Sequence, residues 1–168
     1  MQIVQPIKEK EKIDEIQAIL MNQSMRDWLL FTFGITSGLH LNDLLMLQVK
    51  HVKNKTTVVL QEEKTGKEKS FPLSEELREA IAEYIQGMQD EDFLFRSQRT
   101  GKPIKRIRVY RILNQAAKQA GLEDIGTHTL RKTFGYHYYL RTKDVGKLKD
   151  IFNHSAPSVT LRYIGVSS

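Results

Sequence analysis

The order of apolar and polar residues predicts a chain of short helices that is interrupted by one pair of strands. Over residues 9–22, isolated apolar residues recur at helical spacing among charged ones, a pattern typical of a surface helix. The segment from Ser24 to Gly38 is apolar almost throughout, which predicts a buried helix that begins after a serine cap and ends near a glycine. A short helix over residues 41–47 is expected to follow.

The pattern changes from helical to extended after Thr56. "TTVVL" is rich in β-branched residues, "EKTGKE" has the composition of a turn, and "KSFPL" can return antiparallel to the first run. Ser74 then has the composition and position of a helix cap. The apolar stripe of that helix comprises Leu77, Ile81, Tyr84, Ile85 and Met88. After it, "DFLF" is expected to be a short strand or a buried extended segment.

The last third of the chain is predicted to be helical. A helix over 104–120 ends at Gly121, a common stop for a helix. Its inward face is expected to comprise Ile107, Tyr110, Leu113 and Ala117. Three further helices are expected to start near Thr127, Asp144 and Pro157. The predicted fold class is therefore mainly α with a small antiparallel β-sheet (α+β), in a single domain.

Charge is distributed unevenly between the two parts of the chain. The formal net charge is +6, but residues 1–95 carry 11 Lys/Arg against 16 Asp/Glu, whereas residues 96–168 carry 15 against 4. A basic part beside an acidic part indicates a face that binds a polyanion such as nucleic acid. The alternative is a basic surface that is merely solvated.

Composition excludes several other classes. The 168 residues are enough to bury a core, and no apolar run approaches the roughly 20 residues that a membrane helix needs. The start of the chain turns charged before an apolar stretch forms, unlike a signal peptide. Because the chain has no cysteine, disulfides, thiolate zinc sites and a cysteine nucleophile are excluded, and a cytoplasmic location is expected.

Three separated stretches carry the candidate chemistry. "GTHTLRKTFG" places His128 and Arg131 three residues apart, on one face of one helix. "NHSAPSVTLRYIG" places His154 nine residues before Tyr163, with a proline-started helix between them. "QEEKTGKEKSFPL" puts Lys64 at the tip of the predicted hairpin. Each stretch alone is weak, since such residues are usually found on solvated or half-buried surfaces, and their order and spacing carry the argument.

Together these residues resemble the catalytic domain of the tyrosine recombinases, the phage integrase family. "HTLRKTFG" is similar to the family's His-x-x-Arg box, "HSAPSVTLRY" to its histidine before the nucleophilic tyrosine, and "KTGKEKSFPL" to its lysine turn. "SGLHLNDLLML" looks like the family's first box, and "RVYRILNQAAKQAGL" like the helix before the second. The resemblance runs from about Trp28 to Gly165.

The resemblance implies DNA strand breakage and rejoining through a 3′-phosphotyrosine intermediate. Tyr163 would attack the phosphodiester and hold the phosphate in a covalent bond, which permits rejoining without ATP or metal. Arg131 would clamp the phosphate, because a guanidinium donates two parallel hydrogen bonds to phosphate oxygens. His128 would act as a general acid or base or as a phosphate donor near the tyrosine.

The remaining site residues implied by the resemblance surround the same phosphate. His154 would donate to the phosphate, and Lys64 would protonate the leaving 5′-hydroxyl. Lys67 is the alternative to Lys64 if the turn forms differently. No cofactor and no metal are expected at this site. Further DNA contacts are expected from Lys67, Lys105, Arg106, Arg108 and Lys132.

One position departs from the family pattern. His40 stands in "SGLHLND" where the family carries an arginine that would be the second phosphate clamp, while Asp43 keeps the acidic residue that supports it. Losing one preorganised donor at a developing oxyanion costs on the order of 10²–10³ in rate. Arg26 lies too far back in the preceding helix to replace it, so reduced cleavage is expected.

The resemblance also sets the expected partners and organisation. Double-stranded DNA is the expected partner, with self-association on DNA as a tetrameric synapse and no membrane. The whole chain, 1–168, is expected to be one catalytic domain without a separate N-terminal core DNA-binding domain. The leading hypothesis is a site-specific recombinase or integrase of a mobile element.

Three alternatives remain open from the sequence. A catalytically degenerate DNA-binding or regulatory relative is favoured by His40. A type IB topoisomerase shares the phosphate chemistry but normally lacks a box like "HTLRKTFG". An unrelated helix-turn-helix regulator would give no reason for the spacing of the candidate site residues.

Overall fold

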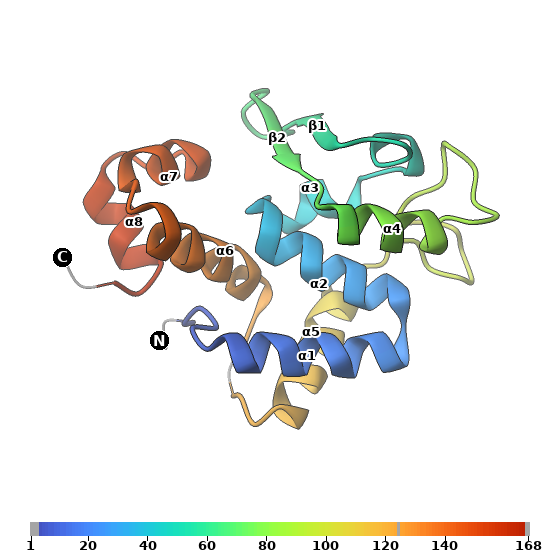
Figure 1. Ribbon diagram of the computed structural model, residues 1–168, viewed down its shortest axis with the longest axis horizontal. Coiled ribbons are helices and arrows are strands. Elements are labelled where there is room, and N and C mark those ends of the chain that lie inside the picture. The colour runs from blue at the N-terminus through green and yellow to red at the C-terminus, as the bar shows by residue number, and fades with distance from the viewer. Residues whose placement is uncertain (1–3, 124, 167–168) are drawn as a thin grey trace.

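The computed structural model describes residues 4–123 and 125–166, and they form the expected mainly helical domain with one small sheet (Figure 1). The elements in chain order are α1 (Lys10–Gln23), α2 (Met25–Ser37), α3 (Leu41–Leu45), a 3₁₀ turn (Val49–His51), β1 (Thr57–Gln61), β2 (Glu68–Pro72), α4 (Glu75–Tyr84), α5 (Arg106–Gln119), α6 (Thr127–Thr142), α7 (Val145–Phe152) and α8 (Pro157–Tyr163). No described helix is both long enough and apolar enough to cross a membrane.

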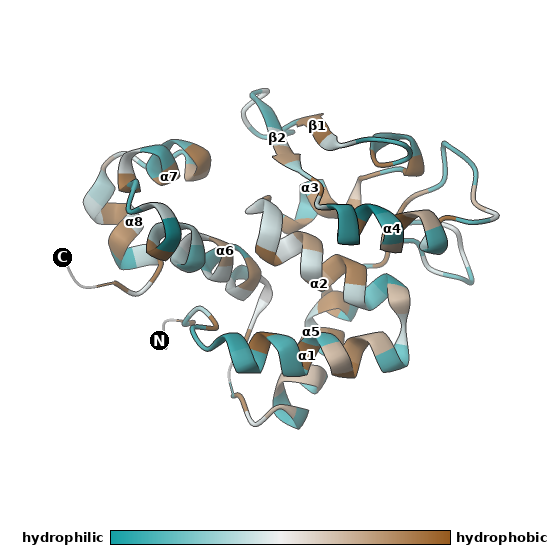
Figure 2. Cartoon of the chain, in the orientation of Figure 1, coloured by the Kyte–Doolittle hydropathy of each residue, from teal (hydrophilic) through white to brown (hydrophobic). Residues whose placement is uncertain are grey.

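Helix α2 is the centre of the core, and it packs against α1, α3, α4 and α6. The Ser24 side chain accepts a hydrogen bond from the Asp27 amide at its start, and Gly38 ends it with a φ of 71°, as the sequence predicts. A Cβ atom on Gly34 would lie 2.5 Å from the Leu130 side chain, so this glycine permits the close approach of α2 and α6. Figure 2 shows hydrophobic residues concentrated along α2, whereas α4 has a largely hydrophilic outer surface.

The two strands pair antiparallel, from Thr57 opposite Pro72 to Gln61 opposite Glu68. The turn between them contains Gly66 at a φ of 71°, a conformation that glycine adopts without strain. The hairpin is fixed to the C-terminal part of the chain, because Lys69 Nζ donates to the carbonyl of Ile151 over 3.0 Å. The turn that carries Lys64 therefore lies beside α7 rather than extending freely into solvent.

The structure corrects two predicted helix faces. In α5 the side chains of Ile107 and Tyr110 are 60% and 43% exposed, whereas the prediction placed both inward. The buried residues are Val109, Ile112, Leu113, Ala116 and Ala117. The alanines of this buried stripe are small and let neighbouring helices approach closely. Ile107 and Tyr110 lie outside the stripe and remain exposed. Helix α4 ends at Tyr84, so Ile85 and Met88 follow the helix instead of extending its stripe.

"DFLF" ends in a fully buried pair of residues, but it is neither a strand of the sheet nor a continuous extended segment. Phe93 forms one isolated antiparallel bridge with Gln48, and the amide of Leu94 donates to the carbonyl of Leu47. Leu94 and Phe95 are fully buried. The predicted burial is therefore confirmed, whereas the predicted strand or extended backbone is wrong, because a turn at Leu94 and Phe95 follows the bridge at Phe93.

Helices α6, α7 and α8 form a second, smaller cluster around Leu148, Phe152 and Ile164. Gly135 of α6 makes this packing possible, because a Cβ atom there would lie 2.7 Å from Ile164 and 2.8 Å from Phe152. In Figure 1 these three helices stand together beside the rest of the domain, joined to it through α6. The site described below lies where the two parts meet.

Candidate active site

Helix α6 presents the predicted His-x-x-Arg pair at the boundary between the two clusters. Arg131 is only 6% exposed, and its Nε donates to the carbonyl of Gly38 over 2.8 Å. Its Cζ lies 4.4 Å from the centre of the Phe152 ring, so an aromatic face supports the guanidinium. The hydrogen bond to Gly38 uses Nε, which leaves the two terminal nitrogens for other partners. The arginine is thus buried, oriented and able to bind an anion.

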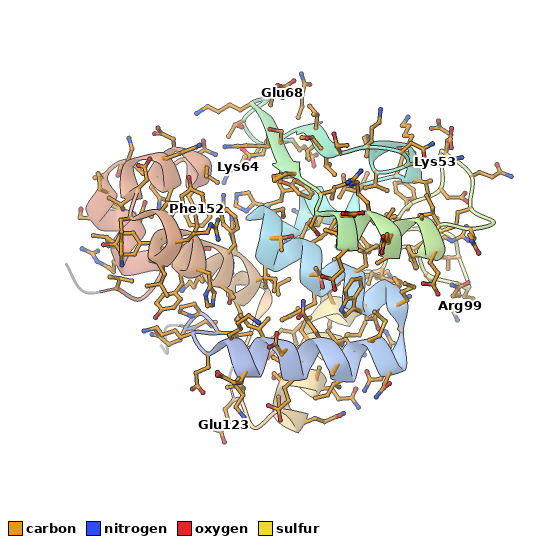
Figure 3. The ribbon with its side chains drawn as sticks, viewed as in Figure 1. Lys53, Lys64, Glu68, Arg99, Glu123 and Phe152 are labelled. Atoms are coloured by element: carbon orange, nitrogen blue, oxygen red, sulfur yellow. The ribbon has the colours of Figure 1, made fainter. Side chains whose placement is uncertain are left out.

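An open cavity of about 620 Å³ brings together most of the predicted residues. It is formed by the start of α3, the hairpin turn, the start of α5 and the start of α6. Its polar lining comprises His40, Asn42, Asp43, Glu63, Lys64, Arg106, His128 and Arg131. Figure 3 labels Lys64 near the hairpin and Phe152 among the C-terminal helices. The sequence separates these residues widely, and the fold unites them.

Tyr163 ends α8 and packs beside Arg131 rather than lining that cavity. Its ring lies 5.4 Å from Phe152 and 5.2 Å from His154, centre to centre, and Lys132 Nζ lies 4.9 Å from the ring centre. Burial raises the pKa of the Tyr163 hydroxyl, while the positive charge of Arg131 and a hydrogen bond from it act in the opposite direction. Arg131 therefore connects the half-buried tyrosine to the cavity.

His154 is held by its neighbours in α8. Its Nδ1 lies 2.8 Å from the hydroxyl oxygen of Thr160, which is fully buried. When the hydroxyl donates to Nδ1, the ring proton resides on Nε2, and Nε2 can then donate to a phosphate. Burial lowers the pKa of His154, and the nearby charge of Arg131 lowers it further.

The two lysines of the hairpin turn have different surroundings. Lys64 is exposed and lines the cavity with Arg131. Lys67 Nζ instead donates to the side-chain oxygen of Asn153 over 3.2 Å and does not line the cavity. Of the two lysines that the sequence left open, Lys64 is the one that the structure brings to the site.

His40 and Asp43 lie together on the cavity wall. Burial lowers the pKa of His40, as does the charge of Arg131, although Glu62 and Asp43 oppose this. Burial raises the pKa of Asp43, whose Oδ1 accepts a hydrogen bond from the amide of Glu63. Position 40 thus supplies an imidazole that is largely neutral at pH 7 where the family would supply a guanidinium.

Sequence reasoning missed Glu62 as part of this site. Its side chain is 2% exposed and accepts hydrogen bonds from Thr65 at 2.6 Å and Asn153 at 3.1 Å. Burial raises its pKa, but these hydrogen bonds and the charge of Lys69 outweigh burial, so the pKa lies below its ordinary value. The buried anion joins the hairpin to the loop after α7. No spacing rule in the sequence singles it out among the acidic residues of the turn.

The predicted DNA-contact residues differ in exposure. Lys105, Arg106 and Arg108 are exposed near the start of α5. Lys132 is only 8% exposed, and its Nζ donates to the carbonyl of Val4 over 2.8 Å. The amide of Ile7 also donates to Thr133, so the N-terminal segment lies along α6. Three of these residues are therefore accessible to solvent, whereas Lys132 holds the N-terminal segment near Tyr163.

The histidines of the site predict how stability depends on pH. Burial and the nearby charge of Arg131 lower the pKa values of His40 and His154, so the unfolded chain binds more protons than the folded one as pH falls toward and below about 6.5. We expect the melting temperature of the free protein to fall between about pH 7.5 and 5.5 at constant ionic strength. His40→Gln and His154→Gln together should flatten this dependence. If the melting temperature stays constant or rises as the pH is lowered from about 7.5 to 5.5, the lowered pKa values of these histidines would be contradicted.

Comparison with known proteins defines the family. Residues 8–168 match the family model described as "Phage integrase family", and the chain belongs to that family. It is 54% identical over 166 residues to "Probable integrase/recombinase YoeC" of Bacillus subtilis, covering 99% of this chain and 92% of that protein. It is 27% identical over 184 residues to "Tyrosine recombinase XerC" of Staphylococcus epidermidis, covering 99% of this chain and 62% of that protein. The predicted class, a tyrosine recombinase or integrase, is confirmed.

Solved structures confirm the predicted fold. A crystal structure of XerA recombinase superposes with a TM-score of 0.79 at 18% identity, covering 100% of this chain and 62% of that one. The catalytic domain of bacteriophage HP1 integrase gives a TM-score of 0.69 at 20% identity, covering 96% of this chain and 88% of that domain. The chain thus spans nearly all of YoeC but under two thirds of XerC and of the XerA chain.

Proposed function

We propose that this protein cuts and rejoins duplex DNA through a covalent bond between Tyr163 and the 3′-phosphate. The observation that carries the proposal is the position of Arg131, whose guanidinium packs on the same Phe152 ring as Tyr163 and whose side chain lines the cavity with Lys64 and His128. A phosphate bound at Arg131 would therefore meet a nucleophile and proton donors together. Family membership and the DNA-bound recombinases among similar structures support the same reaction.

The chemistry of the step follows from these groups. The Tyr163 oxygen bonds to phosphorus, and the bond from phosphorus to the 5′-oxygen breaks. The tyrosine proton passes to His128 or to solvent, and Lys64 protonates the departing 5′-oxygen. Arg131 and His154 donate to the non-bridging oxygens, where negative charge increases in the transition state. Rejoining reverses the step, because the phosphotyrosine retains the energy of the broken bond.

The basic side chains at the start of α5 support a DNA-binding role beyond the reacting phosphate. Lys105, Arg106 and Arg108 are exposed around the start of α5, and Arg106 lines the cavity wall. Such contacts to phosphates orient a duplex without reading its sequence, and their contribution falls as salt increases. A tetrameric assembly on DNA is part of the proposal, since recombination joins two duplexes.

Trapping the covalent intermediate tests this function. Duplexes that the protein binds are selected from a random-sequence library at low salt, and each is then nicked near its centre so that cleavage releases a short fragment. We expect a denaturant-resistant protein–DNA adduct, with the DNA attached at Tyr163 by mass spectrometry. Tyr163→Phe should form no adduct while its DNA binding stays within about threefold. DNA binding by the wild-type protein without any adduct would contradict the proposal.

A second candidate function is DNA binding without cleavage, and the histidine at position 40 is the observation that favours it. His40→Arg restores the guanidinium that the family carries, so we expect a higher yield of adduct from the same nicked duplex, by about tenfold or more. The yield is measured on denaturing gels alongside DNA affinity. An unchanged yield with intact binding would show that position 40 does not limit cleavage.

A further inference from the structure

The site described above has one buried arginine for the scissile phosphate, whereas the family pattern has two arginines there. Negative charge in the transition state spreads over the non-bridging phosphate oxygens, and a single guanidinium fork cannot neutralise both fully. Arg131 is the buried guanidinium of the cavity, and position 40 contributes an imidazole with a lowered pKa. If the protein cleaves DNA, another cation should reach the same phosphate.

Arg106 lies where such a cation is needed. It is the first residue of α5, and it lines the same cavity as His40, His128 and Arg131. Its Nη1 donates to the side-chain oxygen of Asn42 over 2.9 Å, across 64 positions of the chain. Asn42 stands between His40 and Asp43 in the sequence, so the guanidinium is tied to the wall where the missing arginine would belong.

The partner of Arg106 leaves its charge available. An amide oxygen orients the guanidinium without neutralising it, and a phosphate can displace that oxygen because a charge-assisted hydrogen bond is stronger. Arg26, the candidate from the preceding helix, is committed elsewhere, since it donates to Asp27 at 2.8 Å and to the carbonyl of Arg96 at 3.2 Å. Among the described arginines, Arg106 and Arg131 are the two that line this cavity.

We propose that Arg106 supplies the second guanidinium on the scissile phosphate and so takes over part of the role for which position 40 offers only a histidine. The inference rests on the strand-cleavage function proposed above. It assigns a catalytic role to a residue on a different element from the family's first box, with Asn42 as its positioning residue. Asn42 holds the side chain at the cavity wall until DNA arrives.

The first test compares arginine variants on the nicked duplex selected with the wild-type protein. Arg106→Ala is expected to lower the rate of adduct formation by about 10²-fold while DNA affinity falls less than about tenfold. Arg106→Lys should recover part of the rate. Arg111→Ala is the matched control, because Arg111 is also exposed on α5 but does not line the cavity, and its rate should stay within about threefold. Equal rates for Arg106→Ala and Arg111→Ala would overturn the assignment.

A substrate series then identifies the phosphate that Arg106 serves. The adduct defines the scissile position, and a methylphosphonate, which lacks the negative charge, is placed there or at either neighbouring phosphate. The defect of Arg106→Ala relative to wild type should shrink to under about fivefold only when the methylphosphonate is at the scissile position. A defect that disappears with a neighbouring substitution would assign Arg106 to DNA positioning and overturn a catalytic role.

A double substitution separates this inference from the function on which it rests. With His40→Arg present, Arg106→Ala should cost less than about fivefold, since residues that share one role are not additive. An undiminished cost would contradict the replacement of one arginine by the other. Absence of any wild-type adduct would instead refute the strand-cleavage function, and the Arg106 inference with it. Circular dichroism of each variant confirms that the comparisons concern folded protein.

Discussion

Arg131→Lys is expected to lower the rate of adduct formation on the nicked duplex by on the order of 10²–10³. Arg131 divides its donors between the Gly38 carbonyl and the cavity, and its planar group lies on the Phe152 ring. A lysine keeps the charge, but its three donors share one nitrogen and cannot reproduce the planar guanidinium that reaches the carbonyl and two phosphate oxygens from separate nitrogens. Single-turnover adduct formation, followed on denaturing gels, measures the loss.

Arg141→Lys is the matched control for this prediction. Arg141 lies on the same helix, is exposed, and has its guanidinium 5.5 Å from the Tyr138 ring centre. Arg141→Lys therefore makes the same substitution beside an aromatic ring, but outside the cavity. The rate of adduct formation by this variant should stay within about threefold of wild type. If the two lysine variants react equally fast, the fork geometry of Arg131 is not what the reaction requires.

The elements of the fold were largely predictable because their signals are local. Ser24 and Gly38 mark the ends of α2, and the β-branched run after Thr56 marks β1. The face of α5 was predicted wrongly, because Ile107 and Tyr110 are as apolar as the residues that are buried. Only the packing of neighbouring helices decides which part of a wide apolar stripe is covered.

The candidate site was predictable only as far as its motifs are contiguous. The three-residue spacing of His128 and Arg131 fixes them on one helical face, whatever the rest of the chain does. The bond between Arg106 and Asn42 joins segments 64 positions apart, and the one between Arg131 and Gly38 joins segments 93 positions apart. Local composition does not predict contacts between residues so far apart in the sequence. The sequence alone therefore identified no arginine that could replace the one absent at position 40.

The other large effect is expected at Phe152, whose ring packs against several residues of the site. The ring is 3% exposed and contacts the guanidinium of Arg131 and the rings of His154 and Tyr163. Phe152→Ala should lower the free energy of unfolding by about 3–5 kcal/mol, because it leaves a cavity in the small C-terminal cluster. It should also reduce adduct formation to background in the fraction that remains folded, since three site residues lose a common support.

Phe95→Ala distinguishes loss of support from loss of stability. Phe95 is fully buried in the main cluster, where it packs edge to face on Phe33, 5.9 Å between ring centres. Its removal should cost a similar free energy of unfolding in urea but leave the tyrosine and its neighbours in place. At a temperature where both variants are folded by circular dichroism, Phe95→Ala should form adduct at nearly the wild-type rate and Phe152→Ala should not. Equal residual rates would mean that the C-terminal cluster stabilises the domain without positioning Tyr163, because both variants would then act through stability alone.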